Sequence, residues 1–434
     1  MNAAGIRRRY YILNGSFTMA ASLIWGVNTL FLLDTGLDMF EVFGVNAVFT
    51  LAMTLFEIPT GAVADSRGRR VSLIWSSIFL FVGTLGYLAA GTWGGGVPAF
   101  AAASMVLGLG FTFFSGAAEA WAVDELAAVG DEESITSLFA NAATAASVTM
   151  LGGTVLGGFL GSVDYRVPYL MRAALFLVML GLSLFAMPEK GWRPDGETLS
   201  ALTRIRRTAR DSMEFGFRSK ALRQLMGVSF FLGVFMMWGF YALQPYITDL
   251  AGFPGAAWLS GLVTAVLTLS QVGGQSLARK SGAVSKMGGN LAGAMAVSAL
   301  GAVLTGLAGL PITADVLVFP GPPLLALAGM ILMMGGLGYA GPFQRTALHG
   351  RVPSDKRATV ISLESLVSSG GAIVGQPGLG WVARKWSISA GYFIGAGLFA
   401  ATQPLLALFR RSEEEEERAS EVNQKQATNQ GLER

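Results

Sequence analysis

The chain has 434 residues, of which 52% are apolar and 14% are charged, and its mean hydropathy is +0.53. A soluble protein this apolar would lack polar residues to cover its surface, and a disordered chain would be far less apolar. The net charge of +3 is small, and zero cysteines with a single histidine exclude a disulfide framework and a thiolate or histidine-rich metal site. We therefore expect a polytopic membrane protein with no metal and no cofactor.

Twelve stretches are long and apolar enough to cross a bilayer as helices, which takes about 20 mostly apolar residues. We therefore predict an all-α polytopic membrane protein with twelve transmembrane helices. The predicted spans cover residues 11–33, 40–63, 71–91, 97–123, 135–160, 166–187, 224–248, 256–278, 288–309, 319–344, 358–382 and 388–409.

The basic residues predict how the chain is oriented. Twelve spans place alternate connecting segments on the same face of the membrane. Nearly all of the 31 lysines and arginines fall on the face that carries both termini, and the exceptions are Arg166, Arg172, Arg384 and Lys385. Cytoplasmic segments carry such an excess in membrane proteins. The sequence therefore predicts a multi-pass protein of the cell membrane with both termini in the cytoplasm.

A central polar stretch predicts the domain organisation. Residues 188–223 divide the chain into residues 1–187 and residues 224–410, each with six spans. We interpret the divider as a central cytoplasmic loop between two pseudo-symmetric six-helix bundles. Residues 411–434, which include a run of glutamates at 413–417, are predicted to form a solvated, acidic cytoplasmic tail.

Weak sequence echoes connect the two blocks. In the fourth span Glu119 follows Gly116 by three residues, and in the tenth span Gln344 follows Gly341 by three residues. Parallel repeats of this kind place a substrate site between the bundles, near the bilayer midplane.

The most specific motif lies between the second and third spans, where residues 59–70 read PTGAVADSRGRR. Gly61 would permit close helix approach and Gly68 a tight turn. The segment resembles the loop motif G-x-L-a-D-r-x-G-r-r of the major facilitator superfamily, with matches at Gly61, Ala64, Asp65, Gly68, Arg69 and Arg70. With twelve spans and a central loop, the resemblance covers nearly the whole chain. It implies the major facilitator fold and transport by alternating access.

The resemblance also implies a latch at the cytoplasmic gate. Asp65 would face the positive N-terminal end of the eleventh span, which begins near Arg357. Arg69 would pair with Asp65 or with an acid at the end of the fourth span, where Asp124 stands. Positive-inside anchoring alone would explain the arginines but not the Gly and Asp spacing. The counterpart after the eighth span has Ala278 at the acid position, which predicts that the second copy of the latch is degraded.

The fifth span carries Gly153, Gly157 and Gly158 in the sequence GTVLGG. This is similar to the G-P-x-x-G-G motif of proton-coupled exporters in the superfamily, although Thr154 replaces the proline. The resemblance is to the twelve-span drug:proton antiporter branch. Packing of small residues against a neighbouring helix is the alternative explanation.

Two carboxylates inside predicted spans are candidates for proton coupling, because ionisable groups in the membrane are costly. Glu119 shares one helical face with Thr112 and Ser115 and can exchange a proton if it faces a partly dry cavity. Its alternative role is a structural ion pair with Arg345 or Arg172. Glu364 in the eleventh span is the second candidate, and a solvated or gating role is its alternative.

Other polar and aromatic side chains follow inward-facing stripes, because polar groups in hydrocarbon need partners. They predict a cavity of amide, hydroxyl and aromatic groups with few charges, which suits an amphipathic or moderately apolar molecule. Trp238 can alternatively face lipid. The cavity candidates are Trp25, Asn28, Thr112, Ser115, Trp238, Tyr241, Gln244, Gln271, Gln344 and Arg345.

These observations predict a secondary active transporter for a small organic molecule, working as a proton-driven exporter. Its expected partners are the substrate, protons and the lipid bilayer, without nucleic acid, and the expected state is monomeric. Proton-linked uptake is the alternative within the same superfamily, because direction is not encoded in these motifs. A membrane enzyme or sensor is the remote alternative, since we find no nucleophile elbow, zinc pattern or phosphate loop.

Overall fold

The structure, a computed structural model, describes residues 2–131, 135–192, 219–281, 287–318, 320–352 and 357–432. The regular structure of these residues is entirely helical. Ten helices among them are long and apolar enough to cross a membrane. Together with the first span, which is broken, and helix α15, they account for the twelve predicted spans.

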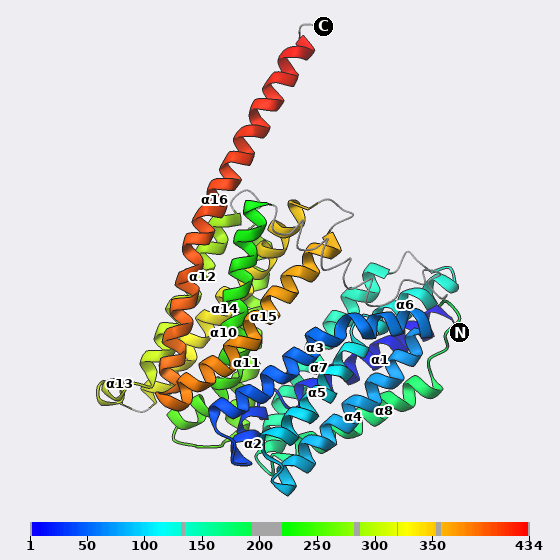
Figure 1. The fold of residues 1–434 in the computed structure, drawn as a ribbon, viewed down its shortest axis with the longest axis vertical. Helices are drawn as coiled ribbons and strands as arrows, with labels where there is room; N and C mark the ends of the chain where they lie inside the picture. The colour runs from blue at the N-terminus through cyan, green and yellow to red at the C-terminus, as the bar shows by residue number, and fades with distance from the viewer. Residues whose placement is uncertain are drawn as a thin grey trace.

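The helices form two bundles that follow one another along the chain (Figure 1). The first bundle contains α1 (Ala3–Ser22), α2 (Asn28–Asp34), α3 (Met39–Arg67), α4 (Arg69–Trp93), α5 (Gly96–Phe114), α6 (Ala117–Ala128), α7 (Ile135–Gly161) and α8 (Arg166–Phe185). The second contains α10 (Lys220–Leu250), α11 (Ala257–Ser281), α12 (Met287–Ala308), α13 (Pro311–Val316), α14 (Gly321–Gly350), α15 (Arg357–Lys385) and α16 (Ile388–Leu432).

Several predicted boundaries differ from the structure. The first span is two helices, α1 and α2, and the fourth span is broken into α5 and α6 at Ser115–Gly116, where Gly116 has a φ of +72°. Helix α3 continues through Arg67, so most of the motif at 59–70 is helical and the turn is confined to Gly68. The central loop from residue 193 to 218 lies outside the described residues.

Each bundle has its own core. Trp121 and Tyr169 are among the largest fully buried side chains of the first bundle, and Trp238 and Tyr392 are among those of the second. One large side chain crosses over: Phe43 of α3 packs in the second core, with its ring centroid 5.9 Å from that of Trp238. The bundles are therefore separate packing units that meet mainly where α3 packs against α15 and α7 against α11.

The glycines of the fifth span are packing sites. A Cβ at Gly157 would collide with the carbonyl oxygen of Leu23, and a Cβ at Gly153 would lie 3.0 Å from that of Met19. Gly158 faces the other bundle, where an added Cβ would lie 2.8 Å from the Ala257 carbonyl oxygen. Gly153 and Gly157 thus let α7 pack closely against the first span, and Gly158 lets it pack closely against α11.

Helix α16 extends far beyond the bundle (Figure 1). The sequence predicted a solvated tail after residue 410, whereas the structure continues the helix to Leu432. Glu413 in this extension is half-buried; it accepts a hydrogen bond from the Gly288 backbone N–H (2.8 Å) and lies 3.7 Å from Arg351. The beginning of the tail is therefore part of the second bundle.

The substitution Gly157→Ala is expected to destabilise the protein, because the new methyl group forces α7 away from the first span. The cost should be about 1–3 kcal/mol. Gly152→Ala is the matched control, because a Cβ at Gly152 meets nothing within 4 Å. Thermal unfolding in detergent, followed by tryptophan fluorescence, measures both variants. Equal melting temperatures for the two would contradict the packing role.

Candidate functional site

The break in the first span is completed by a side chain from the second bundle. Gln244 of α10 is fully buried; its Nε2 donates to the Trp25 carbonyl oxygen (2.7 Å), and its Oε1 accepts from the Thr29 backbone N–H (2.8 Å). The Thr29 hydroxyl donates to the Tyr241 carbonyl oxygen (3.0 Å). Because backbone groups in the membrane interior need partners, these bonds replace those lost where the helix breaks. We call these four residues the Gln244 clasp.

The clasp belongs to a larger set of contacts at one end of the molecule, which we call the closed end. Three further interactions join the bundles there: Tyr165 Oη donates to Gly255 O (2.5 Å), Trp258 N donates to Ser162 Oγ (3.0 Å), and Arg384 pairs with Asp38 (3.0 Å). Burial, with a contribution from Asp34, raises the pKa of the Tyr165 hydroxyl, so it stays a neutral donor at physiological pH.

Three glycines let the backbones of the two bundles touch at the closed end. A Cβ added to Gly26 would lie 2.7 Å from the Gly261 Cα, and one added to Gly158 would lie 2.9 Å from the same atom. In Figure 1 the bundles are close beside α2 and diverge toward the ends of α6 and α14. The halves are thus held together at the closed end.

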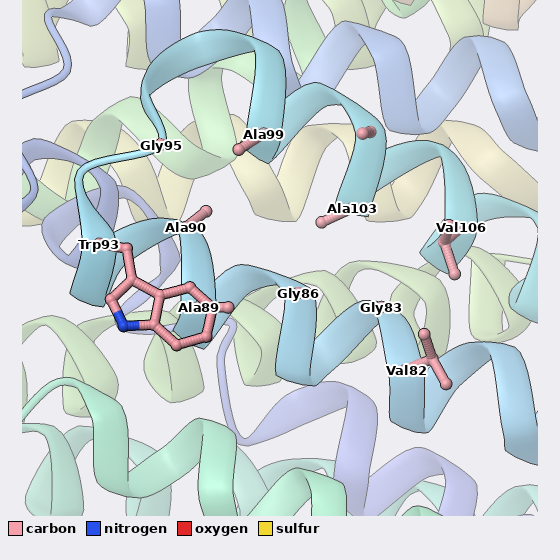
Figure 2. Close-up of a pocket in the computed structure, with 11 residues that line it drawn as sticks. Val82, Gly83, Gly86, Ala89, Ala90, Trp93, Gly95, Ala99, Ala103 and Val106 are labelled. Atoms are coloured by element: carbon pink, nitrogen blue, oxygen red, sulfur yellow. The ribbon is translucent and has the colours of Figure 1, made fainter.

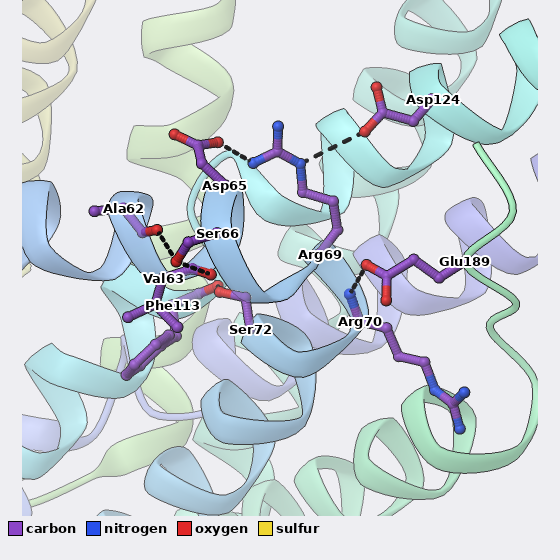
Figure 3. Close-up of polar contacts among 10 residues, drawn as sticks. All are labelled: Ala62, Val63, Asp65, Ser66, Arg69, Arg70, Ser72, Phe113, Asp124 and Glu189. Atoms are coloured by element: carbon purple, nitrogen blue, oxygen red, sulfur yellow. Dashed lines mark hydrogen bonds and ion pairs between the residues drawn. The ribbon is translucent and has the colours of Figure 1, made fainter. Parts of the chain in front are cut away.

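The opposite end, which we call the basic end, carries the sequence motif (Figure 3). The Arg69 guanidinium pairs with Asp65 one turn earlier, and its Nε lies 3.5 Å from an oxygen of Asp124 on α6. These partners all belong to the first bundle. The side chain of Arg357, at the start of α15, lies outside the described residues, so the expected contact of Asp65 with the eleventh span remains a prediction.

Arg70 and Glu189 fasten the end of α8 to the start of α4. The Arg70 guanidinium donates to the carbonyl oxygens of Ser183 (2.9 Å) and Leu184, and the Arg70 backbone N–H donates to Glu189 Oε1 (3.0 Å). Figure 3 shows Glu189 facing the start of α4, beside Gly68. The carboxylate thus caps the positive end of that helix.

The second bundle repeats this arrangement. Glu189 follows the sixth span and caps the third, whereas Glu413 lies in the extension of the twelfth span and accepts the Gly288 N–H at the start of the ninth. A carboxylate clamp therefore occurs once in each half, at corresponding places.

A cavity of about 320 Å³ lies among the helices α1, α6 and α7 of the first bundle. Its lining includes Tyr10, Asn14 and Glu119. The Glu119 carboxylate is exposed and forms no hydrogen bond or ion pair within the described residues. The predicted single face with Thr112 does not form, because the helix breaks at Ser115–Gly116; Thr112 is buried and Ser115 is exposed.

Glu364 belongs to a polar cluster of the second bundle. Its Oε1 accepts from the Ser229 hydroxyl of α10 (2.7 Å), and that hydroxyl oxygen accepts from Nε2 of Gln344 on α14 (2.7 Å). Ser229 is fully buried, whereas the Glu364 side chain is half-buried. Neighbouring Arg345 is exposed and is not part of the described bonds of the cluster. A carboxylate is therefore held where three helices meet.

The remaining cavity candidates fall in different places. Trp238 is fully buried in the second core, against Phe43, and lines no described cavity. Asn28 is buried and joins two helices, because it donates to Asn46 (3.3 Å) and accepts from the Tyr169 hydroxyl (2.9 Å). The half-buried candidates are Trp25, Tyr241 and Gln271.

A second depression is apolar and lies between α4 and α5 (Figure 2). It has a volume of about 400 Å³ and is lined by small residues such as Gly83 and Ala103, with Trp93 at its edge. The Trp93 side chain is 82% exposed. No charged or hydroxyl side chain lines this groove, so it lacks the chemistry to orient a polar ligand.

The sequence prediction missed several residues that carry these contacts. Thr29 and Ser229 lie inside apolar spans, and nothing in their spacing distinguishes them from ordinary helix hydroxyls. Glu189 and Glu413 offered a signal, because each follows the last span of its half. Comparing those two positions would have suggested the repeated clamp.

The sequence matches the family model of the Major Facilitator Superfamily over residues 10–375. The chain belongs to this superfamily, and it is a multi-pass membrane transporter of the major facilitator fold. No curated protein matches the sequence.

Solved structures show the same fold over nearly the whole chain. The nucleoside transporter NupG is similar with a TM-score of 0.72 and 14% identity, covering 94% of this chain and 99% of that one. A D-xylose–proton symporter gives 0.67 and 16%, covering 94% and 96%. A bacterial homologue of the iron transporter ferroportin, in an inward-facing state, gives 0.69 and 14%, covering 94% and 100%. At these identities the likeness establishes the fold.

The substitution Gln244→Leu is expected to open the closed end. It leaves the Trp25 carbonyl and the Thr29 N–H without their partner, which costs about 1–3 kcal/mol in the closed arrangement. Spin labels at Val163→Cys and Val316→Cys, positions 82% and 73% exposed, report the separation in a chain with no native cysteine. Double electron–electron resonance should show a larger long-distance population.

The matched control for this experiment is Gln403→Leu. Its amide donates to the Ala292 carbonyl oxygen (3.0 Å) inside the second bundle and does not join the halves. If both glutamine variants leave the distance distribution as in the parent protein, the Gln244 clasp does not hold the closed end.

Proposed function

We propose that this protein is a secondary active transporter of the cell membrane that exports a small amphipathic organic molecule in exchange for protons. Its family membership supports the transporter class. The observation that carries the mechanism is the Gln244 clasp, because it joins the halves at the closed end while they diverge toward the basic end. Alternating access requires such a junction to break when the opposite end closes.

The sidedness of this proposal rests on charge. The basic end carries Arg69 and Arg70, together with Arg351 of the second bundle. Basic residues favour the cytoplasmic side of a membrane. With the basic end in the cytoplasm, the closed end faces outward. Arg69 and its carboxylate partners then lie at the cytoplasmic end, where they can re-pair as the halves move.

Two carboxylates are suited to carry the coupling proton. Glu119 is exposed beside a cavity and has no ion-pair partner among the described residues, so a proton can reach it. Glu364 is held by the Ser229 hydroxyl and lies close to Gln344, so its protonation would rearrange a bond between α10 and α15. The first site exchanges protons with the cavity, and the second links protonation to helix packing.

Uptake driven by protons is the second candidate, because the same parts work in either direction. A protein described as a D-xylose–proton symporter has this fold, which supports this candidate. Accumulation of a transported compound in cells with and without the protein separates the two: export lowers accumulation, and uptake raises it.

The substitution Glu119→Gln is expected to abolish proton-coupled transport, because an amide cannot exchange a proton. Proteoliposomes containing trapped pyranine report proton movement when amphipathic compounds are added, and the same preparation reports compound movement under an imposed pH gradient. Downhill exchange of the compound should persist in the variant. Glu414→Gln, at an exposed position on α16, is the control. Unchanged proton movement in Glu119→Gln would remove this residue from the mechanism.

A further inference from the structure

A buried cation lies in the first bundle without a counter-charge among the described residues. Arg172 lies two turns into α8 and is 2% exposed. It is not part of any ion pair in the described part of the chain. A charged group in the membrane interior is expensive unless it is paired, and such residues mark substrate and ion pathways.

The surroundings of Arg172 are aromatic. Tyr169 lies one turn before Arg172 on α8, and its ring stacks on that of Tyr87 with the centroids 5.9 Å apart. The Tyr87 hydroxyl bonds to Ser104 (2.6 Å), and the Tyr169 hydroxyl donates its proton away from the guanidinium, to an asparagine. The Nε of Arg172 has no hydrogen-bond partner in the structure.

Two aromatic rings flank the guanidinium. The Arg172 Cζ lies 5.9 Å from the ring centroid of Phe111 and 5.3 Å from that of Phe176. Cation–π contacts recover only a small part of the desolvation cost of a buried cation, so they do not neutralise the charge. The Nε donor of Arg172 is therefore left without a partner by these contacts.

Arg172 is connected to the Gln244 clasp and to a group of aromatic rings. Tyr169, one turn earlier on α8, donates to Asn28, the residue before Thr29 of the clasp. Phe111, which lies under the guanidinium, is half-buried and makes edge contacts with the half-buried rings of Phe17 (5.1 Å) and Phe49 (5.2 Å). A ligand held by Arg172 would contact apolar ring surface and lie beside the junction that must open.

We propose that Arg172 is the anion-binding residue of the transport site and that the transported molecule is a small organic anion with an apolar body. This inference rests on the proposed function, because it takes the bound molecule to be the one that is transported. The guanidinium binds the carboxylate, or a comparable monovalent anionic group, through charge-assisted hydrogen bonds. The rings of Phe111 and its neighbours contact the apolar body. Bound anion supplies the counter-charge that no described residue provides.

Thermal shift in detergent tests binding with matched probes. Hexanoate, benzoate and 1-naphthoate are compared with their amides and with 1-naphthylmethylammonium, and thiocyanate serves as a small polarisable anion. At least one of these anions should raise the melting temperature in a saturable way, while its neutral or cationic counterpart does not. Arg172→Met should weaken this binding by about tenfold or more, and Arg172→Lys by less.

Arg166→Met is the matched control, because Arg166 lies six residues earlier on the same helix and is exposed. It should bind the anion as the parent protein does. Without ligand, Arg172→Met should melt at the parent temperature or higher, since it removes an uncompensated charge. The proposal is overturned if no anion stabilises the parent protein, or if the anion shift survives in Arg172→Met. A lower melting temperature of the unliganded Arg172→Met protein would also overturn it, because it would assign the arginine a structural role.

Proteoliposome transport separates this inference from the proposed function. Anion binding at Arg172 without transport of any compound would retain the site and reject the transporter mechanism. Transport of neutral or cationic compounds that is unaffected by Arg172→Met would retain the transporter and reject the anion. Transport of the anion that is lost in Arg172→Met and kept in Arg166→Met supports both.

Discussion

The backbone hydrogen bonds of the first span are satisfied only while the second bundle is in contact with it. Between α1 and α2 the helix is broken, and the Gln244 amide supplies both a donor and an acceptor to the backbone at the break. Lipid can supply neither, so when the halves separate at this end, water or another side chain must take over these bonds. Local hydrogen bonding in one span is thereby tied to the arrangement of the whole molecule. If the halves move as proposed, this break ties the state of the interface to the hydrogen bonding of the first span.

Features that depend on local composition could be predicted from the sequence, whereas contacts between the bundles could not. Span number and the two-block organisation follow from apolar length and charge placement, and both depend only on local composition. The helix breaks cannot be predicted in this way, because Ser115 and Gly116 lie within a continuous apolar run. The prediction that Thr112 and Glu119 share one helical face was therefore wrong. Gln244 was predicted to avoid lipid, but its partner lies more than 200 positions away in the chain and can be found only from the three-dimensional packing.

The internal repeat is clearer in the contacts between helices than in the amino-acid sequence. Glu189 and Glu413 occupy corresponding places, although the sequences around them differ. The glycines of the fifth and eleventh spans behave alike, because Gly157 and Gly375 each face a backbone carbonyl of a neighbouring helix. The two candidate proton carriers lie at different places in their halves: Glu119 is on α6, in the fourth span, and Glu364 is on α15, in the eleventh. The scaffold is thus symmetric, while the chemistry divides between the halves.

The glycines at the closed end have a mechanical consequence. Gly26, Gly158 and Gly261 bring three backbone segments from the two bundles into direct contact, with no side chain between them. A fulcrum without side chains has no rotamers to rearrange when the bundles tilt, so movement there meets little local friction. If the bundles rock about this contact as proposed, the polar bonds around it set the barrier, and single substitutions can change its height while leaving the glycine contact intact.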